Sequence, residues 1–226
     1  MQRGTQWLSI SDMMAGLMMV FLLVAVAFMI QTDAEKASMA EVAQTYQQNR
    51  LDLAKALREE LQDDLIRWSA EILPDTTVRF SKPEILFDVN SAKLKPEFER
   101  ILNDFFPRYL GVLAQPVFAE DIAEIRIEGH TSSDWEGANS ELEAYMRNMD
   151  LSQARSSSVL EYVYRLDAVE SQRDWLSSTL RASGMAFAEL ITDDFGREDA
   201  ARSRRVEFKV ITKTEDRIIE ILERAR

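Results

Sequence analysis

The chain has 226 residues, a formal net charge of −12, a single histidine (His130) and no cysteine. The acidic balance argues against direct nucleic-acid binding, because phosphate contacts need a surplus of lysine and arginine. The composition also excludes disulfides, cysteine nucleophiles, thiolate metal sites and any metal site that needs two imidazoles. With no nucleophile elbow and no phosphate-binding glycine loop, the sequence predicts no catalytic site, no bound metal and no cofactor.

The run Met13–Ile30 is apolar and uncharged. As a helix it would cover about 27 Å, close to the roughly 30 Å hydrocarbon core of a bilayer. It is longer than the apolar core of a signal peptide, and only Arg3 supplies positive charge before it. We therefore predict a retained transmembrane helix over residues 7–31.

The charges that flank this helix predict its orientation. Arg3 precedes it, in a short start over residues 1–6, whereas Asp33 and Glu35 follow it. Because positive charge favours the cytoplasmic side, we expect a single-pass inner-membrane protein with a cytoplasmic N-terminus and a periplasmic C-terminal domain.

Asp12 lies at the start of the apolar run. A carboxylate inside a membrane is costly and is usually functional, although one at the boundary can be stabilised by the helix dipole and by headgroups. Desolvation favours the neutral acid, so Asp12 could alternate between protonated and charged forms as an ion carrier. Helical spacing places it on one face with Gly16, Met19, Leu23, Val26 and Ile30.

Residues 32–73 predict a helical linker that ends at Pro74, because residues 33–72 contain no glycine or proline. A short heptad pattern over residues 39–56 is compatible with a coiled coil in a dimer. The later apolar positions form a wider stripe, which predicts packing against a globular domain. These positions are Leu53, Leu57, Leu61, Leu65, Trp68 and Ile72.

Residues 75–212 predict one α+β domain, an α/β sandwich with helices on one face of a mixed sheet. Residues 213–226 predict a terminal helix. Alternation of apolar and polar residues predicts strands at 77–80, 84–89, 122–128 and 204–211, whereas 3.6-residue periodicity predicts helices at 95–113, around 159–166 and around 175–184.

Three motifs within residues 75–212 occur in an order that resembles the OmpA-like peptidoglycan-binding domain. They are Ile85-x-Phe87 with Asn90-Ser91, then Gly129-His130-Thr131 with Asn148-x-x-Leu151-Ser152-x-x-Arg155, then Ser203-Arg204-Arg205-Val206-Glu207. The resemblance implies binding to the diaminopimelate of the wall peptide, whose carboxylate an arginine can hold bidentately.

The same resemblance assigns site residues, with one departure. Arg155 matches the family's ligand arginine, but Ser132 stands where the family has an aspartate that follows Gly-His-Thr. Asp134 is the nearest acid that could bind the ligand's ammonium group. Thr131, Asn148, Arg204 and Arg205 complete the predicted site; one of the two arginines is expected to form a structural salt bridge, and His130 to bond the backbone at the strand end.

The N-terminus resembles MotB-type stator subunits, through the pattern Trp7-x-x-x-x-Asp12-x-Met14-x-x-x-Met18-x-x-Phe21, and most closely the stator-like B subunits of Zorya anti-phage systems. This implies a homodimer inside a pentamer of a MotA-like partner, ZorA in Zorya systems, with protons as the transported ion. The alternatives are a flagellar stator, a passive wall anchor without ion chemistry, and a TolR/ExbD-type energiser.

Overall fold

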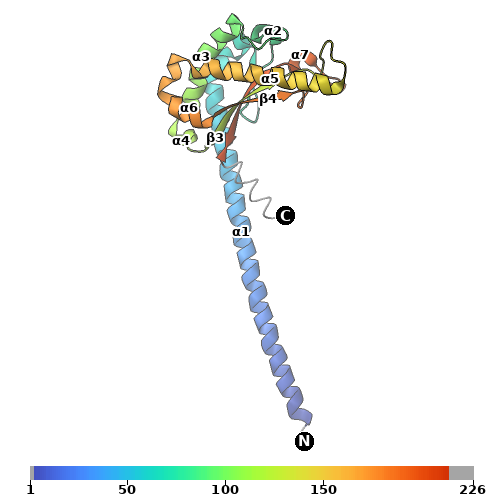
Figure 1. Ribbon diagram of the computed structural model, residues 1–226. Coiled ribbons are helices and arrows are strands. Elements are labelled where there is room, and N and C mark those ends of the chain that lie inside the picture. Colours follow the sequence, from blue (N-terminus) through green and yellow to red (C-terminus); the bar gives the residue numbers. More distant parts are fainter. Residues whose placement is uncertain (1–2, 214–226) are drawn as a thin grey trace.

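The computed structural model describes residues 3–213, apart from the side chains of residues 3–12 and of several residues between 34 and 46 (Figure 1). A single helix, α1 (Arg3–Trp68), runs through both the predicted membrane segment and the predicted linker. Its first half projects away from the folded domain. The predicted terminal helix falls, except for Lys213, outside the described residues.

The C-terminal part of α1 packs onto the domain. Leu53, Leu57 and Leu61 are buried, and so is Trp68, whose ring meets Phe105 edge-on with 5.8 Å between centroids. Their spacing places them on one helix face, as the apolar stripe predicted. The helix ends at Trp68 and not at Pro74, because Ser69 adopts a positive φ of 52° and the next residues pair as a strand.

The domain contains a five-stranded mixed sheet with strand order β1-β2-β5-β3-β4. All neighbouring pairs are antiparallel except β3 and β4. The fold is therefore α+β with a mixed sheet, as predicted. The strands are β1 (Ala70–Ile72), β2 (Val78–Phe80), β3 (Ile122–His130), β4 (Leu180–Ala186) and β5 (Val206–Thr212).

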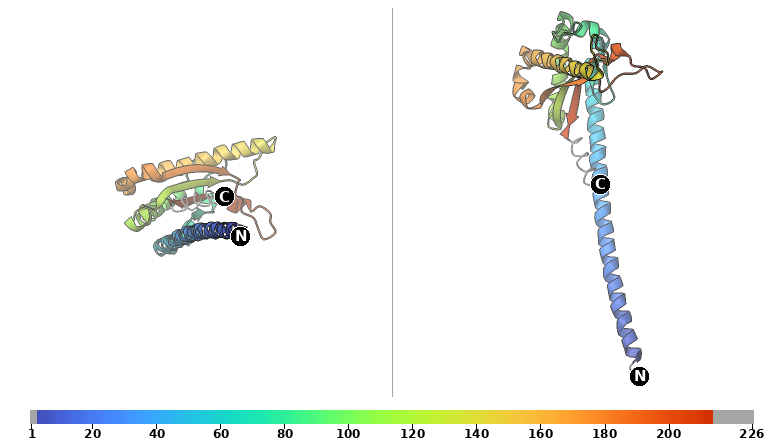
Figure 2. Two further views of the ribbon diagram at one scale, coloured as in Figure 1. Left: turned by 90° about the horizontal axis from the view of Figure 1, so that it is seen from below. Right: turned by 45° about the vertical axis from the view of Figure 1, so that its right-hand side comes forward.

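The two long helices of the domain cover one face of this sheet (Figure 2). α3 (Pro96–Leu113) packs its aromatic side chains against Phe80 and Phe208, and α5 (Glu141–Tyr164) lies against β3 and β4. Alternate strand residues point to the opposite face, where the side chains are charged. The remaining helices are short: α2 (Pro83–Leu86), α4 (Pro116–Ala119), η1 (Asp167–Gln172), α6 (Arg173–Thr179) and α7 (Ala200–Ser203).

Two predicted elements are wrong. The expected strand at 84–89 is the short helix α2, which Pro83 begins, and only Phe87 pairs there, in an isolated bridge with Leu94. The expected helix around 175–184 stops at Thr179, and Leu180–Ala186 forms strand β4 instead. The small residues of β4 give no hydrophobic alternation from which a strand could be predicted.

Candidate functional site

A cavity of about 550 Å³ lies where the end of β3, the middle of α5 and the segment after α2 meet. It contains five of the predicted site residues: Thr131, Asp134, Asn148, Arg155 and Arg204. Its other walls are formed by Pro83, Glu84, Phe87, Asp88, Val89, Asn90, Lys95, Ser132, Trp135, Glu136 and Leu151.

The backbone of the Gly-His-Thr motif is fixed by both neighbouring strands. The N–H of His130 donates to the carbonyl of Arg205 at 3.0 Å, and the N–H of Thr131 donates to the carbonyl of Ala186 at 2.8 Å. Strand β3 therefore delivers Thr131 to the rim of the cavity. Its hydroxyl oxygen is buried and has no hydrogen-bond partner among the described residues.

Helix α5 supplies Asn148 and Arg155 from one face. Ser140 caps this helix, since its hydroxyl accepts the N–H of Glu143 at 3.2 Å. Asn148 and Arg155 are two turns apart and so point the same way. The Nδ2 of Asn148 is buried and unpartnered within the described part of the chain, which leaves a donor available to a ligand.

Arg155 is half-buried and held in place by backbone carbonyls. Its Nε donates to Ser91 at 2.9 Å and its Nη2 to Asp88 at 3.1 Å, and the guanidinium lies 4.9 Å from the centre of the Phe87 ring. Burial, with the nearby charge of Arg204, lowers the pKa of Arg155 to about 10. No carboxylate among the described residues lies within 4 Å of its guanidinium nitrogens, so the group is available to a ligand carboxylate.

Arg204 also faces the cavity without an acidic partner. Its Nη1 lies 3.4 Å from the hydroxyl of Ser132, the residue at which this chain departs from the OmpA-like pattern. Among the described residues, neither Arg204 nor Arg155 forms a salt bridge. Two guanidinium groups without acidic partners among the described residues thus line the same cavity.

Arg205 lies apart from this cavity. It is buried, its Nε donates to Glu207 at 2.6 Å, and its Nη1 donates to the carbonyls of Glu189 and Ser203. These contacts give it a structural role, whereas its neighbour Arg204 lines the cavity. Alternation along an extended chain explains why two consecutive arginines point to different places.

Acidic groups also line the cavity. Asp134 is exposed and lines the cavity together with Glu136. The loop that carries them is anchored where the N–H of Ser133 donates to Glu198 at 2.9 Å. Sequence reasoning did not identify Lys95, another cation in the wall, which is paired with Asp88 at 3.1 Å.

The His130 side chain does not make the backbone bond that was expected. Both ring nitrogens are buried without a hydrogen-bond partner in the described part of the chain. The ring faces Glu128 and Glu207 on the charged side of the sheet.

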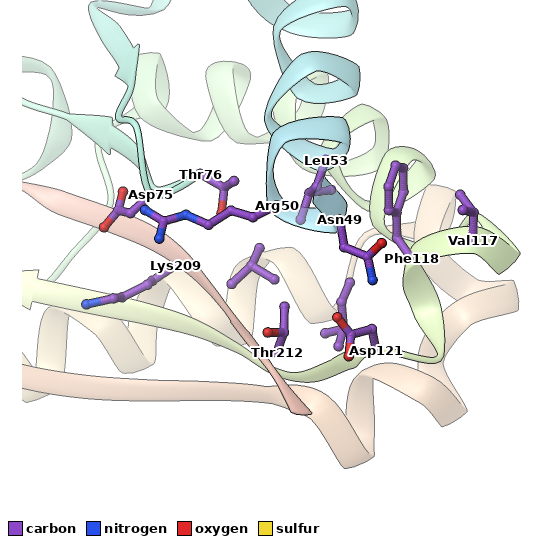
Figure 3. A pocket seen from close by; sticks show the side chains of 12 residues that line it. Asn49, Arg50, Leu53, Asp75, Thr76, Val117, Phe118, Asp121, Lys209 and Thr212 are labelled. Carbon is purple, nitrogen blue, oxygen red and sulfur yellow. The ribbon is translucent and has the colours of Figure 1, made fainter. Parts of the chain in front are cut away.

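A second, smaller pocket of about 160 Å³ lies where α1 meets the end of the sheet (Figure 3). Arg50 of α1 points toward Asp75 there and donates to the carbonyl of Pro74 at 3.3 Å. None of the predicted site residues lines it.

One helix segment, Met13–Asp33, is long and apolar enough to cross a membrane. Its apolar side chains from Met13 to Ile30 are exposed. Asp12 precedes this segment within α1, and its side chain lies outside the described part of the structure.

Comparison with known proteins gives a relative of nearly the same length. The chain is 46% identical over 223 residues to Zorya protein ZorB of Escherichia coli, an alignment that covers 98% of this chain and 94% of that protein. No family profile matches the chain.

Several solved structures are similar in fold. The cell wall anchor of the T6SS from Pseudomonas aeruginosa is 22% identical with a TM-score of 0.48, over 70% of this chain and 97% of that one. A putative MotB-like protein from Desulfovibrio vulgaris is 21% identical with a TM-score of 0.47, over 73% and 99%. The periplasmic domain of Helicobacter pylori MotB is 15% identical with a TM-score of 0.45, over 69% and 97%.

Proposed function

We propose a function that follows from one premise: this chain belongs to the ZorB family of Zorya proteins. Zorya is an anti-phage system, and in it the chain acts as the wall-anchored B subunit of a proton-driven motor in the inner membrane. Two copies sit inside a pentamer of a MotA-like partner, ZorA. The near-full-length identity to a Zorya protein favours defence over flagellar propulsion.

One observation carries this proposal. The helix that contains Asp12 and the membrane segment continues without interruption to Trp68, whose side chain is buried in the core of the domain. About 20 helical residues, or about 30 Å, separate the end of the segment at Asp33 from the first buried position, Leu53. A load on the outer domain is therefore transmitted to the membrane helix through one continuous element.

The cavity between β3 and α5 is the proposed wall site. Arg155 and Arg204 would bind the carboxylates of a diaminopimelate-type peptide, because guanidinium groups hold carboxylates with two parallel hydrogen bonds. Thr131 and Asn148 offer buried polar atoms that need partners. Asp134, which also lines the cavity, would take the ammonium group in place of the family aspartate that Ser132 replaces.

Asp12 is the proposed proton carrier. An elementary charge that crosses 100 mV releases about 2.3 kcal/mol, which is enough to bias a rotary step. The apolar run Met13–Ile30 carries no hydroxyl side chain that could help to coordinate sodium, so a proton is the ion that the sequence favours. The apolar side chains that follow are exposed and available to a partner helix.

The test is Asp12→Asn in cells that carry the complete defence system. Asparagine resembles the neutral acid in shape and hydrogen bonding but cannot titrate. We expect protection from phage to be lost while the partner subunit still co-purifies, whereas Asp12→Glu should retain partial protection.

The matched control is Asp33→Asn, which removes a carboxylate at the other end of the membrane segment. It should leave protection unchanged. Full protection with Asp12→Asn would reject the motor function and favour a passive wall anchor.

A further inference from the structure

Strands β3 and β5 place two buried glutamates directly opposite each other. Glu128 pairs with Glu207 in the antiparallel register, and their exposed fractions are 1% and 4%. Like charges at opposed positions destabilise a sheet, and buried charges require compensation. This pair therefore requires positive charge close by.

Arginines compensate one oxygen of each carboxylate. Oε1 of Glu207 accepts hydrogen bonds from Nε of Arg79 at 2.7 Å and from Nε of Arg205 at 2.6 Å. Oε1 of Glu128 lies 3.6 Å from Nη1 of Arg126. In both residues it is the other oxygen, Oε2, that is turned toward His130.

The imidazole of His130 completes the cluster but does not hydrogen-bond to it. Nε2 lies 3.6 Å from Oε2 of Glu128 and 3.7 Å from Oε2 of Glu207. Both separations are too long for hydrogen bonds. Within the described residues, Oε2 of Glu128 and both ring nitrogens have no hydrogen-bond partner, although His130 is only 1% exposed.

The two separations from Nε2, 3.6 and 3.7 Å, are close to the edges of a tetrahedral coordination site. Tetrahedral zinc with bonds of about 2.0–2.2 Å to nitrogen and oxygen places its ligand atoms about 3.3–3.6 Å apart. The three ligand atoms here all lie within 4.8 Å of one another. The arginines on the far oxygens would orient the two carboxylates, as partners of metal ligands commonly do.

We propose that Glu128, His130 and Glu207 bind one divalent transition-metal ion, for which Zn²⁺ is the best match. One imidazole with two carboxylates is a donor set that suits this ion, and a water molecule or a second carboxylate oxygen would complete it. The ion ties β3 to β5 directly behind Thr131. It thus fixes the strand end that reaches the candidate wall site, and it does not depend on the function proposed for that site.

The test uses the full-length chain in detergent, purified without a polyhistidine tag and stripped with a chelator. Titration with Zn²⁺ should show one saturable site per chain and raise the temperature of unfolding, because a ligand that binds the native state stabilises it. Co²⁺ in place of Zn²⁺ should give the visible absorption of a nitrogen- and oxygen-ligated ion, and Mg²⁺ should not compete.

Variants distinguish Zn²⁺ binding at this cluster from Zn²⁺ binding to surface carboxylates. The distinction is needed because the chain carries 39 aspartate and glutamate residues but one histidine. His130→Gln should lower the affinity for Zn²⁺ by more than about 100-fold, because loss of a residue that only hydrogen-bonds to a metal ligand already costs 10–100-fold. Glu128→Gln is the second variant if His130→Gln does not fold. Glu124→Gln, on the same strand and bonded to Arg126, is the control and should bind normally. No saturable site in the unmodified chain, or a site that survives both cluster variants, would overturn the proposal.

Discussion

Gly129 of β3 lies directly beneath Ser152 of α5. A Cβ atom on Gly129 would be 2.4 Å from the carbonyl oxygen of Ser152, a separation that real Cβ atoms essentially never show. Gly184 of β4 has the same relation to Gln153, whose backbone nitrogen would be 2.4 Å from the added atom. These two glycines let α5 approach the sheet closely, and Arg155 follows one turn later on that helix.

Gly129→Ala should therefore lower stability and weaken wall binding together. Overpacking against backbone typically costs about 1–3 kcal/mol, and relief requires α5 to move and Arg155 to move with it. Gly111→Ala in α3 is the control, because its added Cβ would meet nothing within 4 Å beyond the nearby backbone of its own helix. Alanine there should stabilise by up to about 1 kcal/mol. Denaturant unfolding of the full-length chain in detergent measures both; equal stability of the two variants would contradict the close approach.

Leucine substitutions along α1 test its docking onto the domain. Leu57 is 0% exposed and Leu51 is 64% exposed on the same helix. Leu57→Ala should cost about 2–5 kcal/mol, because it removes buried apolar surface and leaves a cavity. Leu51→Ala should change stability by less than about 0.5 kcal/mol. Similar effects of the two substitutions on the free energy of unfolding would mean that α1 is not part of the core.

Regular periodicity allowed most of the domain to be predicted. β3 alternates cleanly through Ile125 and Ile127, and α3 repeats apolar residues at helical spacing, so both elements were identified from the sequence. β4 was missed because its central residues, Ala182 to Gly184, are small and show no alternation of apolar and polar side chains. Their small size reflects close packing against α5, a tertiary contact that cannot be predicted from a local sequence pattern.

Only those site residues that belong to a recognisable sequence motif could be predicted. Gly-His-Thr and the helix pattern around Arg155 identified Thr131, Asn148 and Arg155, which line the cavity. Spacing alone could not decide which of Arg204 and Arg205 lines it, because that depends on a tertiary contact of Arg205 with the carbonyl of Glu189. The convergence of Glu128 and Glu207 on His130 likewise depends on the register between β3 and β5, which the sequence does not state.

Asp64 provides a test of pH dependence where α1 meets α3. Its Oδ2 accepts a hydrogen bond from Nη1 of Arg108 at 2.6 Å, and this bond, with the charge of Arg67, holds the pKa of Asp64 below its ordinary value of 3.8. A carboxyl with a lowered pKa stabilises the fold above its ordinary value and loses that contribution as pH falls through the lowered one. Asp64→Asn should therefore unfold at a lower temperature than the unmodified chain at pH 7, and the difference should shrink as the pH falls below about 3.8. A difference that does not vary with pH would contradict the ion pair.

Arg155 and Arg204 allow wall binding to be separated from stability. Arg155 donates to two carbonyls, so Arg155→Ala should abolish sedimentation with purified sacculi and also lower stability, by about 1.5–3 kcal/mol for loss of a charged hydrogen-bond donor. The side chain of Arg204 makes only a 3.4 Å contact with Ser132 among the described hydrogen bonds. Arg204→Ala should therefore weaken sedimentation while stability changes by less than about 0.5 kcal/mol.

Arg173→Ala, a substitution on α6 outside the cavity, is the control and should bind normally. Undiminished sedimentation by both Arg155→Ala and Arg204→Ala would move the wall site away from this cavity.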